Sequence, residues 1–222
     1  MGSNDWINLT FISIFVLLVL NKLLFHRRFT LLISGIFNRK YLSFYLKDTP
    51  LITSTFNLIF FPINLLTISL TLYFIVKGYY VELFDSYNLE LFSLIIVALF
   101  LFYLMKIVLR FVINIILSVS KTARQFSFFK LTIRSFSSIV LLPFLMIHQY
   151  SGLDKPFTLT ILLSVFIALL AVQYLYSTQL IIAKKQYPFL YIFLYLCTLE
   201  ILPTIIFIKF VFIIVNNDFH GF

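Results

Sequence analysis

Six long apolar runs constrain the fold of this chain more than any other feature of its sequence. They extend over residues 6–25, 52–76, 91–105, 131–147, 157–182 and 189–215, and charged or turn residues separate them. A transmembrane helix needs about 20 mostly apolar residues to cross about 30 Å of hydrocarbon. The third run carries Lys106 and Arg110 after Met105 and can continue as helix to about Ser120. The sequence therefore predicts six transmembrane helices.

The composition excludes a soluble globular protein. Of the 222 residues, 62% are hydrophobic and 11% are charged, whereas soluble domains average about 45–50% apolar and about 25% charged residues. Apolarity is continuous along each run, which excludes a β-barrel, because its lumen-facing positions are polar at every second residue. No polar stretch is long enough for a soluble domain, so residues 1–222 are expected to form a single all-α integral membrane domain.

Basic residues in the connections predict how the chain crosses the membrane. The connections after the first, third and fifth runs hold five, three and two basic residues, whereas the opposite connections hold only Lys77 and Lys155. The positive-inside rule assigns the basic connections to the cytoplasm. The first run lacks a small-residue cleavage site and is expected to be an uncleaved span. We therefore expect a multi-pass protein of the bacterial inner membrane with both termini on the non-cytoplasmic side.

The first basic connection predicts an interfacial amphipathic helix over about residues 29–47. Its apolar residues fall near helical spacing, which leaves its basic residues free to face water and phosphate. Aromatic residues alternate with basic ones again before the fourth run. Both segments adjoin transmembrane helices directly, so they favour membrane lipids over nucleic acid as the partner. The residues expected to bind lipid headgroups are Arg27, Arg28, Arg39, Lys40, Arg124 and Lys130.

Two patterns of small and polar residues mark helix surfaces inside the apolar runs. A small-residue face on the fifth run, Ser164, Ala168 and Ala171, permits close approach of another helix, either within this protein or in a partner subunit. A polar stripe on the second run suits interhelical hydrogen bonds, with a narrow polar pathway as the alternative. The stripe consists of Thr53, Asn57, Asn64, Thr67 and Thr71.

Glu200 is an acidic residue in the middle of an apolar run, the sixth. It lies eleven residues into the sixth run, which is about 16 Å along a helix and near the bilayer centre. Ionisable groups at that depth usually pair or face a cavity. Lys106 is the first candidate partner and Arg110 the second. A neutral, hydrogen-bonded Glu200 and a proton or ion relay are the alternatives.

No motif in the sequence indicates catalysis. It contains no His-Glu-x-x-His, no Gly-x-Ser-x-Gly, no glycine-rich phosphate loop and no pair of cysteines at metal spacing. We therefore expect no enzymatic activity, no catalytic residues, no cofactor and no metal site.

Residues 195–203, Tyr-Leu-Cys-Thr-Leu-Glu-Ile-Leu-Pro, followed by Lys209, resemble the C-terminal signature of an uncharacterised family of multi-spanning inner-membrane proteins from Bacteroidota. The resemblance implies a Gram-negative inner-membrane location and carries no activity or catalytic residue. It favours an accessory role in cell-envelope machinery such as secretion, motility or export.

Three function classes follow from these features. The first is a non-enzymatic accessory, scaffold or assembly subunit of a larger cell-envelope complex, with other integral membrane proteins as partners. The second is a small ion- or proton-coupled transporter that uses Glu200 and the proline-interrupted runs around Pro62, Pro143 and Pro203. The third is a lipid-linked membrane enzyme. Short loops and the lack of catalytic motifs favour the first.

Overall fold

The computed structural model describes residues 5–37, 55–79, 88–117 and 120–182. They form six helices and no strand, which confirms the all-α prediction for this part of the chain. The helices are α1 (Asp5–Leu24), α2 (His26–Phe37), α4 (Thr55–Tyr79), α6 (Asn88–Leu117), α7 (Ser120–Tyr150) and α8 (Lys155–Ile182). All except α2 contain a segment long and apolar enough to cross a membrane, so five of the six predicted spans are confirmed as candidate spans. The sixth, residues 189–215, lies outside the described residues.

Two helices extend beyond the apolar runs that predict them. α6 continues through Lys106 to Leu117, close to the end expected near Ser120. α7 begins at Ser120, eleven residues before the apolar run, and so includes the basic segment as part of one helix of 31 residues. Pro62 and Pro143 lie inside α4 and α7 without ending either helix. Prolines are tolerated in this way in membrane helices because neighbouring groups can satisfy the freed carbonyls.

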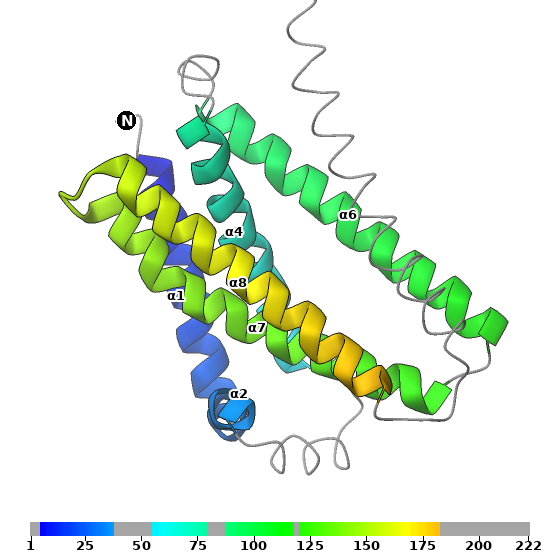
Figure 1. Cartoon of the computed structure of the whole chain (residues 1–222). Helices are drawn as coiled ribbons and strands as arrows, with labels where there is room; N and C mark the ends of the chain where they lie inside the picture. Colours follow the sequence, from blue (N-terminus) through cyan, green and yellow to red (C-terminus); the bar gives the residue numbers. More distant parts are fainter. Residues whose placement is uncertain (1–4, 38–54, 80–87, 118–119, 183–222) are drawn as a thin grey trace, which may run out of the picture.

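α4 occupies the centre of the bundle and contacts α1, α6, α7 and α8. In Figure 1, α1 and α6 lie on opposite sides of α4, and the antiparallel pair α7 and α8 crosses in front of it. More than half of the residues in the apolar span of α4, 56%, are buried, against 17–33% in the other four spans. α4 is therefore the central helix, against which α1, α6, α7 and α8 pack.

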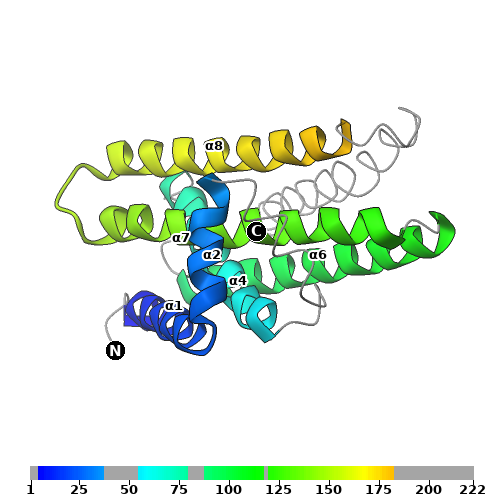
Figure 2. The same cartoon turned by 90° about the horizontal axis from the view of Figure 1, so that it is seen from below.

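α2 crosses one end of the bundle. Seen from that end in Figure 2, it lies across α1, α4 and α7 rather than along them. Backbone hydrogen bonds from Phe25 N to Asn21 O and from Phe29 N to Phe25 O continue almost without a break from α1 into α2. The helix begins at His26, three residues before the expected start, and residues 38–47 lie outside the described part.

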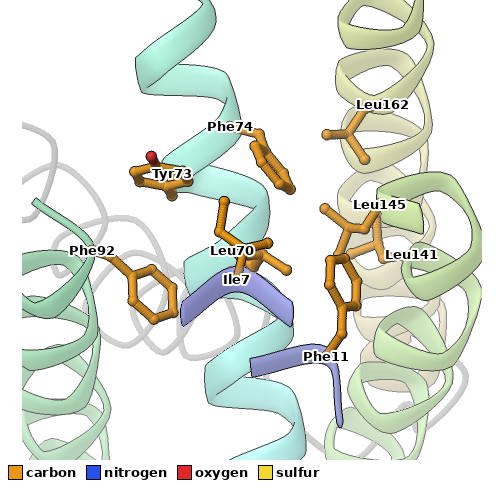
Figure 3. Packing of buried hydrophobic residues seen from close by; sticks show 9 residues of the cluster. All are labelled: Ile7, Phe11, Leu70, Tyr73, Phe74, Phe92, Leu141, Leu145 and Leu162. Atoms are coloured by element: carbon orange, nitrogen blue, oxygen red, sulfur yellow. The ribbon is translucent and has the colours of Figure 1, made fainter. Parts of the chain in front are cut away.

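The largest core cluster joins α4 to four other helices (Figure 3). It consists of Ile7, Phe11, Leu70, Tyr73, Phe74, Phe92, Leu141, Leu145 and Leu162. The Trp6 ring packs edge-on against Tyr73, with centroids 5.0 Å apart, and lies 4.7 Å from the Phe92 centroid. These aromatic contacts fix α1, α4 and α6 to one another at the end of the bundle where α1 begins.

A glycine allows α4 and α8 to approach closely at the same end. A Cβ atom on Gly78 would lie 2.7 Å from Leu159 Cδ1, which is closer than side chains normally pack. A larger residue at this position would have to displace the end of the Leu159 side chain, so Gly78 leaves room for Leu159 between the two helices.

Large aliphatic side chains remain exposed along the outer faces of α1, α6 and α8. They include Leu9, Ile12, Val16, Leu23, Val97, Leu101, Leu104, Ile107, Ile167, Val172 and Leu175. A soluble protein does not expose apolar area on this scale. These faces suit contact with lipid tails or with other membrane helices.

Candidate functional site between helices α4, α6 and α7

A polar contact between two buried side chains links α4 to α7. Ser138 Oγ donates a hydrogen bond to Asn64 Oδ1 at 2.5 Å. Both side chains are almost fully enclosed by protein, with Asn64 4% and Ser138 1% exposed. A polar group in hydrocarbon must find its partner inside the protein. This bond therefore specifies how α4 and α7 pack.

The hydroxyl groups of the polar stripe on α4 bond to their own helix. Thr67 Oγ1 donates to Ile63 O at 2.8 Å, and Thr71 Oγ1 donates to Thr67 O at 2.8 Å. Both threonines are fully buried. Asn57 is only partly buried, and Thr53 lies outside the described residues. Because these hydroxyl groups bond to carbonyls of α4 itself, they can be buried without a hydrogen-bond acceptor on another helix.

We expect Asn64→Ala and Ser138→Ala each to lower the thermal stability by a few degrees, because either change removes the bond between α4 and α7. Asn64→Ala leaves the Ser138 hydroxyl with its longer bond to Arg134 O, at 3.4 Å, in its own helix. Interhelical hydrogen bonds in membrane proteins contribute about 0.6 kcal/mol on average and at most about 1.7, and about 1 kcal/mol shifts Tm by roughly 2–4 °C in a chain of this size. Thermal unfolding in mild detergent would measure the shifts.

The double variant and a surface variant complete that test. Asn64→Ala with Ser138→Ala should lose less than the sum of the two single changes. Ser164→Ala is the control, since Ser164 is exposed and its hydroxyl bonds to Ile161 O in its own helix. Fully additive losses at Asn64 and Ser138 would contradict a bond between them.

A cation lies inside the span of α7 and stacks on α6. The guanidinium carbon of Arg134 is 3.6 Å from the centroid of the Tyr103 ring. Tyr103 is 7% exposed, and Arg134 is partly buried. Arg134 is three residues inside the candidate span Leu131–Tyr150, or about 4–5 Å along the helix axis. A desolvated cation over an aromatic face gains about 2 kcal/mol or more.

The ammonium group of Lys106 lies over the ring of Phe102, the residue next to Tyr103 in α6. Its Nζ atom lies 4.4 Å from the centroid of Phe102, and the rings of Phe102 and Tyr103 are 5.9 Å apart. Lys106 and Arg134 thus lie over two neighbouring aromatic rings of α6, Phe102 and Tyr103. The side chain of Arg110 and the whole of Glu200 lie outside the described part, so the predicted pairing of Glu200 with either α6 residue stays a prediction.

The small-residue face lies on the outside of the described bundle. Ser164, Ala168 and Ala171 on α8 are all exposed. Ile167, 55% exposed, and Val172, 43% exposed, flank it. No described helix covers this face, which leaves it available to another membrane segment.

The residues expected at lipid headgroups are described only in part. Arg27 is exposed at the start of α2, and the guanidinium carbon of the partly buried Arg28 lies 5.8 Å from the Phe25 centroid. Arg124 and Lys130 belong to α7, and their side chains lie outside the described part. Arg39 and Lys40 lie outside the described residues.

Three buried or partly buried polar residues escaped the sequence analysis. Arg134 lies within the predicted fourth span, but it was not singled out, because it continues the basic segment that precedes this span. Ser138 is one of several serines in that span, and only the packing distinguishes it. Asn21 is fully buried at the end of α1 and donates from Nδ2 to Phe56 O at 3.3 Å. An asparagine inside an apolar run is a signal that could have identified this contact.

The opposite end of the bundle holds a hydrogen-bonded pair at the turn between α7 and α8. His148 Nδ1 lies 2.9 Å from Thr158 Oγ1, and the His148 ring packs edge-on against Phe74. Thr158 N and Oγ1 also bond to the carbonyl of Asp154. Among the described residues, no three His, Cys, Asp or Glu side chains gather as a metal site would require. The pair therefore fixes the turn.

These features define a multi-pass membrane protein whose described residues are all-helical. A few of its buried polar side chains join helices, among them Asn21, Asn64 and Ser138, whereas most described hydroxyl groups bond within their own helix. The sequence matches the domain of unknown function DUF4271 over residues 7–211, and the chain belongs to this family. The expectation of an uncharacterised family is thereby confirmed, whereas its restriction to Bacteroidota stays a prediction. Neither the curated proteins nor the solved structures contain a match to this chain.

Proposed function

We propose that the protein is a non-enzymatic accessory, scaffold or assembly subunit of a larger complex in the cell envelope. The observation that carries this proposal is the exposed small-residue face of α8, formed by Ser164, Ala168 and Ala171. Close packing at small residues drives association between membrane helices, because lipid tails are as apolar as leucine and supply no hydrophobic driving force. A helix whose span is only 17% buried in its own bundle has room for such a neighbour.

The polar side chains described above support the same role. The hydroxyls of Thr67 and Thr71 bond within α4, and Asn64 bonds to Ser138. A subunit that acts through its outer surface has no need of an internal polar pathway. Secretion, motility and export machinery are the kinds of complex we propose.

We place the protein in the bacterial inner membrane with both termini outside the cytoplasm. Asp5, Glu90 and Asp154 lie at the end of the bundle where α1 begins, opposite to Arg27 and Arg28 (Figure 1). This charge distribution agrees with the positive-inside rule.

Cysteine labelling is expected to confirm this orientation. In a Cys197→Ser background, membrane-impermeant maleimide added to intact spheroplasts should label single cysteines at the three outer positions and should label the three inner ones only after lysis. The outer positions are Asp85, Asp154 and Asp218, and the inner positions are Lys40, Arg124 and Lys185. Labelling of Lys40 or Lys185 in intact spheroplasts would refute the orientation.

A small ion- or proton-coupled transporter is the alternative function. The observation that favours it is the pair of cations Lys106 and Arg134 within the α6 and α7 spans, since ionisable groups in membranes commonly line ion or proton pathways. Glu200 is the residue we propose to carry the coupling ion in that case.

Two experiments discriminate between these functions. Purification in mild detergent, with quantification of associated proteins by mass spectrometry, should recover a stoichiometric membrane partner if the protein is a subunit. Purified protein in liposomes should then show no solute- or pH-dependent flux. A flux that Glu200→Gln abolishes would reject the subunit proposal and establish the transporter.

A further inference from the structure

Two cations lie within the membrane spans at the end of the bundle where α6 ends and α7 begins. The guanidinium carbon of Arg134 is 3.6 Å from the centroid of the Tyr103 ring, and Lys106 Nζ is 4.4 Å from that of Phe102. Arg134 is three residues inside the start of its candidate span, and Lys106 is two residues inside the end of its own. Both α-carbons therefore lie within about one helical turn of the same end of the spans.

The antiparallel register of α4 and α6 brings an amide to the same level (Figure 1). Phe61 of α4 packs edge-on against Tyr103 of α6, with ring centroids 5.9 Å apart. Toward this end of the bundle, the partly buried Asn57 precedes Phe61 by four residues, and Lys106 follows Tyr103 by three. Residues three or four apart lie on one face of a helix. The register therefore places Asn57 opposite Lys106, one turn beyond the aromatic pair.

The acidic residues that the structure describes lie at the other end of the bundle. They are Asp5 and Glu90, in the first turns of α1 and α6, and Asp154, in the turn before α8 (Figure 1). α7 also begins with a basic segment, which holds three basic residues in its first eleven positions. Charged groups inside a membrane usually pair with a counter-charge or face a cavity. The positive charge where α6 ends and α7 begins therefore favours an anionic ligand.

We propose that Arg134, Lys106 and Asn57 bind the phosphate group of an anionic phospholipid that enters the bundle from the leaflet at this end. Basic pockets between membrane helices on the cytoplasmic side bind the headgroups of lipids such as cardiolipin. The guanidinium of Arg134 offers two parallel N–H donors to phosphate oxygens, and the Lys106 ammonium supplies a point charge. The Asn57 amide supplies a neutral donor. This ligand is independent of whether the protein is a subunit of a larger complex.

The depth of the site favours a lipid over a soluble phosphate. Arg134 and Lys106 lie inside apolar spans, so a free phosphate ion would have to leave water to reach them. Leu104 and Ile107, in the same turn of α6 as Lys106, are 42% and 57% exposed and can contact acyl chains. Stacking on Tyr103 holds the guanidinium in place before a ligand binds, which lowers the entropic cost of binding.

The lipid dependence of thermal stability tests the site. In neutral detergent, cardiolipin should raise Tm of the wild-type protein by several degrees, because a ligand that binds only the folded state stabilises it. Phosphatidylcholine and inorganic phosphate at the same concentration should leave Tm unchanged. Arg134→Gln and Lys106→Gln should each weaken the apparent affinity for cardiolipin by about fivefold.

Lys22→Gln is the matched control, since Lys22 is an exposed cation at the end of α1 on the same side of the bundle. It should bind cardiolipin as the wild-type protein does. Equal weakening in Lys22→Gln and Arg134→Gln would mean that cardiolipin responds only to the net charge and would overturn the proposal. A Tm loss in Arg134→Gln that is the same with and without cardiolipin would also overturn it, because the guanidinium would then serve the protein itself. A rise in Tm with inorganic phosphate as large as that with cardiolipin would reject the lipid.

Lipid capture in native membranes tests the site without removing either cation. A benzophenone amino acid in place of Phe102, whose ring lies next to Lys106 Nζ, should capture lipids enriched in anionic headgroups. The matched control is the same replacement at Phe100, which is 42% exposed. There, the captured lipids should have the composition of the bulk membrane. The same lipid composition at both positions, or no captured lipid at position 102, would reject the proposal.

Discussion

Tyr73→Ala is expected to destabilise the bundle by about 3–5 kcal/mol, the range that deletion of a large aromatic side chain from a packed core produces. Tyr73 is 1% exposed and lies on the central helix α4. Its ring contacts Trp6, and it also contacts Phe74 and Phe92, which are drawn with it in Figure 3. Its removal would leave a cavity among three helices. Thermal unfolding in detergent, together with the amount of folded protein in the membrane, would measure the loss.

Tyr174→Ala provides the matched control for that change. Tyr174 is 41% exposed on α8, so the same substitution should alter Tm by no more than a degree or two. Equal stability losses at the two tyrosines would mean that α4 is not the centre of the bundle.

Ala168→Trp is expected to release the partner subunit, or to separate a homodimer, while the bundle itself still folds. Ala168 is exposed at the middle of the small-residue face of α8, and an indole there would hold a neighbouring helix too far away for close packing. Size-exclusion chromatography in mild detergent should show the loss of the larger species, with Tm of the remaining monomer nearly unchanged.

Leu162→Trp on the same helix separates surface effects from core effects. Leu162 is completely buried in the largest core cluster, so the added bulk should unfold the bundle rather than release a partner. If Ala168→Trp unfolds the protein as Leu162→Trp does, the face is covered by this chain itself and cannot be the partner surface.

Much of the fold follows from the apolar runs because helix formation in a membrane is a local property. The run from Trp6 to Phe25 predicts α1 to within one residue at each end, since every backbone group of the helix must bond within the segment. The start of α7 at Ser120 was missed. Its first turns are basic and aromatic, and hydropathy alone gives no signal for a helix that continues out of the hydrocarbon.

The contacts between helices could not be predicted in the same way. The polar stripe on α4 predicted Asn64 as an interhelical group, but not Ser138 as its partner, because a serine gives no sign of which helix it faces. Arg134 was not singled out, because basic residues near helix ends often extend to the interface and give no sign of a contact inside the bundle. Its stacking on Tyr103 depends on how α6 and α7 pack, which a single sequence does not specify.

The central claim, that the protein works as a subunit of a larger assembly, is tested most directly by the mass of the particle extracted from native membranes. Native mass spectrometry of protein released into lipid nanodiscs should find the 26.1 kDa chain in a complex of fixed stoichiometry, with a second membrane protein or another copy of itself. Ala168→Trp should abolish that complex. A lone monomer in the wild-type preparation, with no partner captured by crosslinking in cells, would contradict the claim.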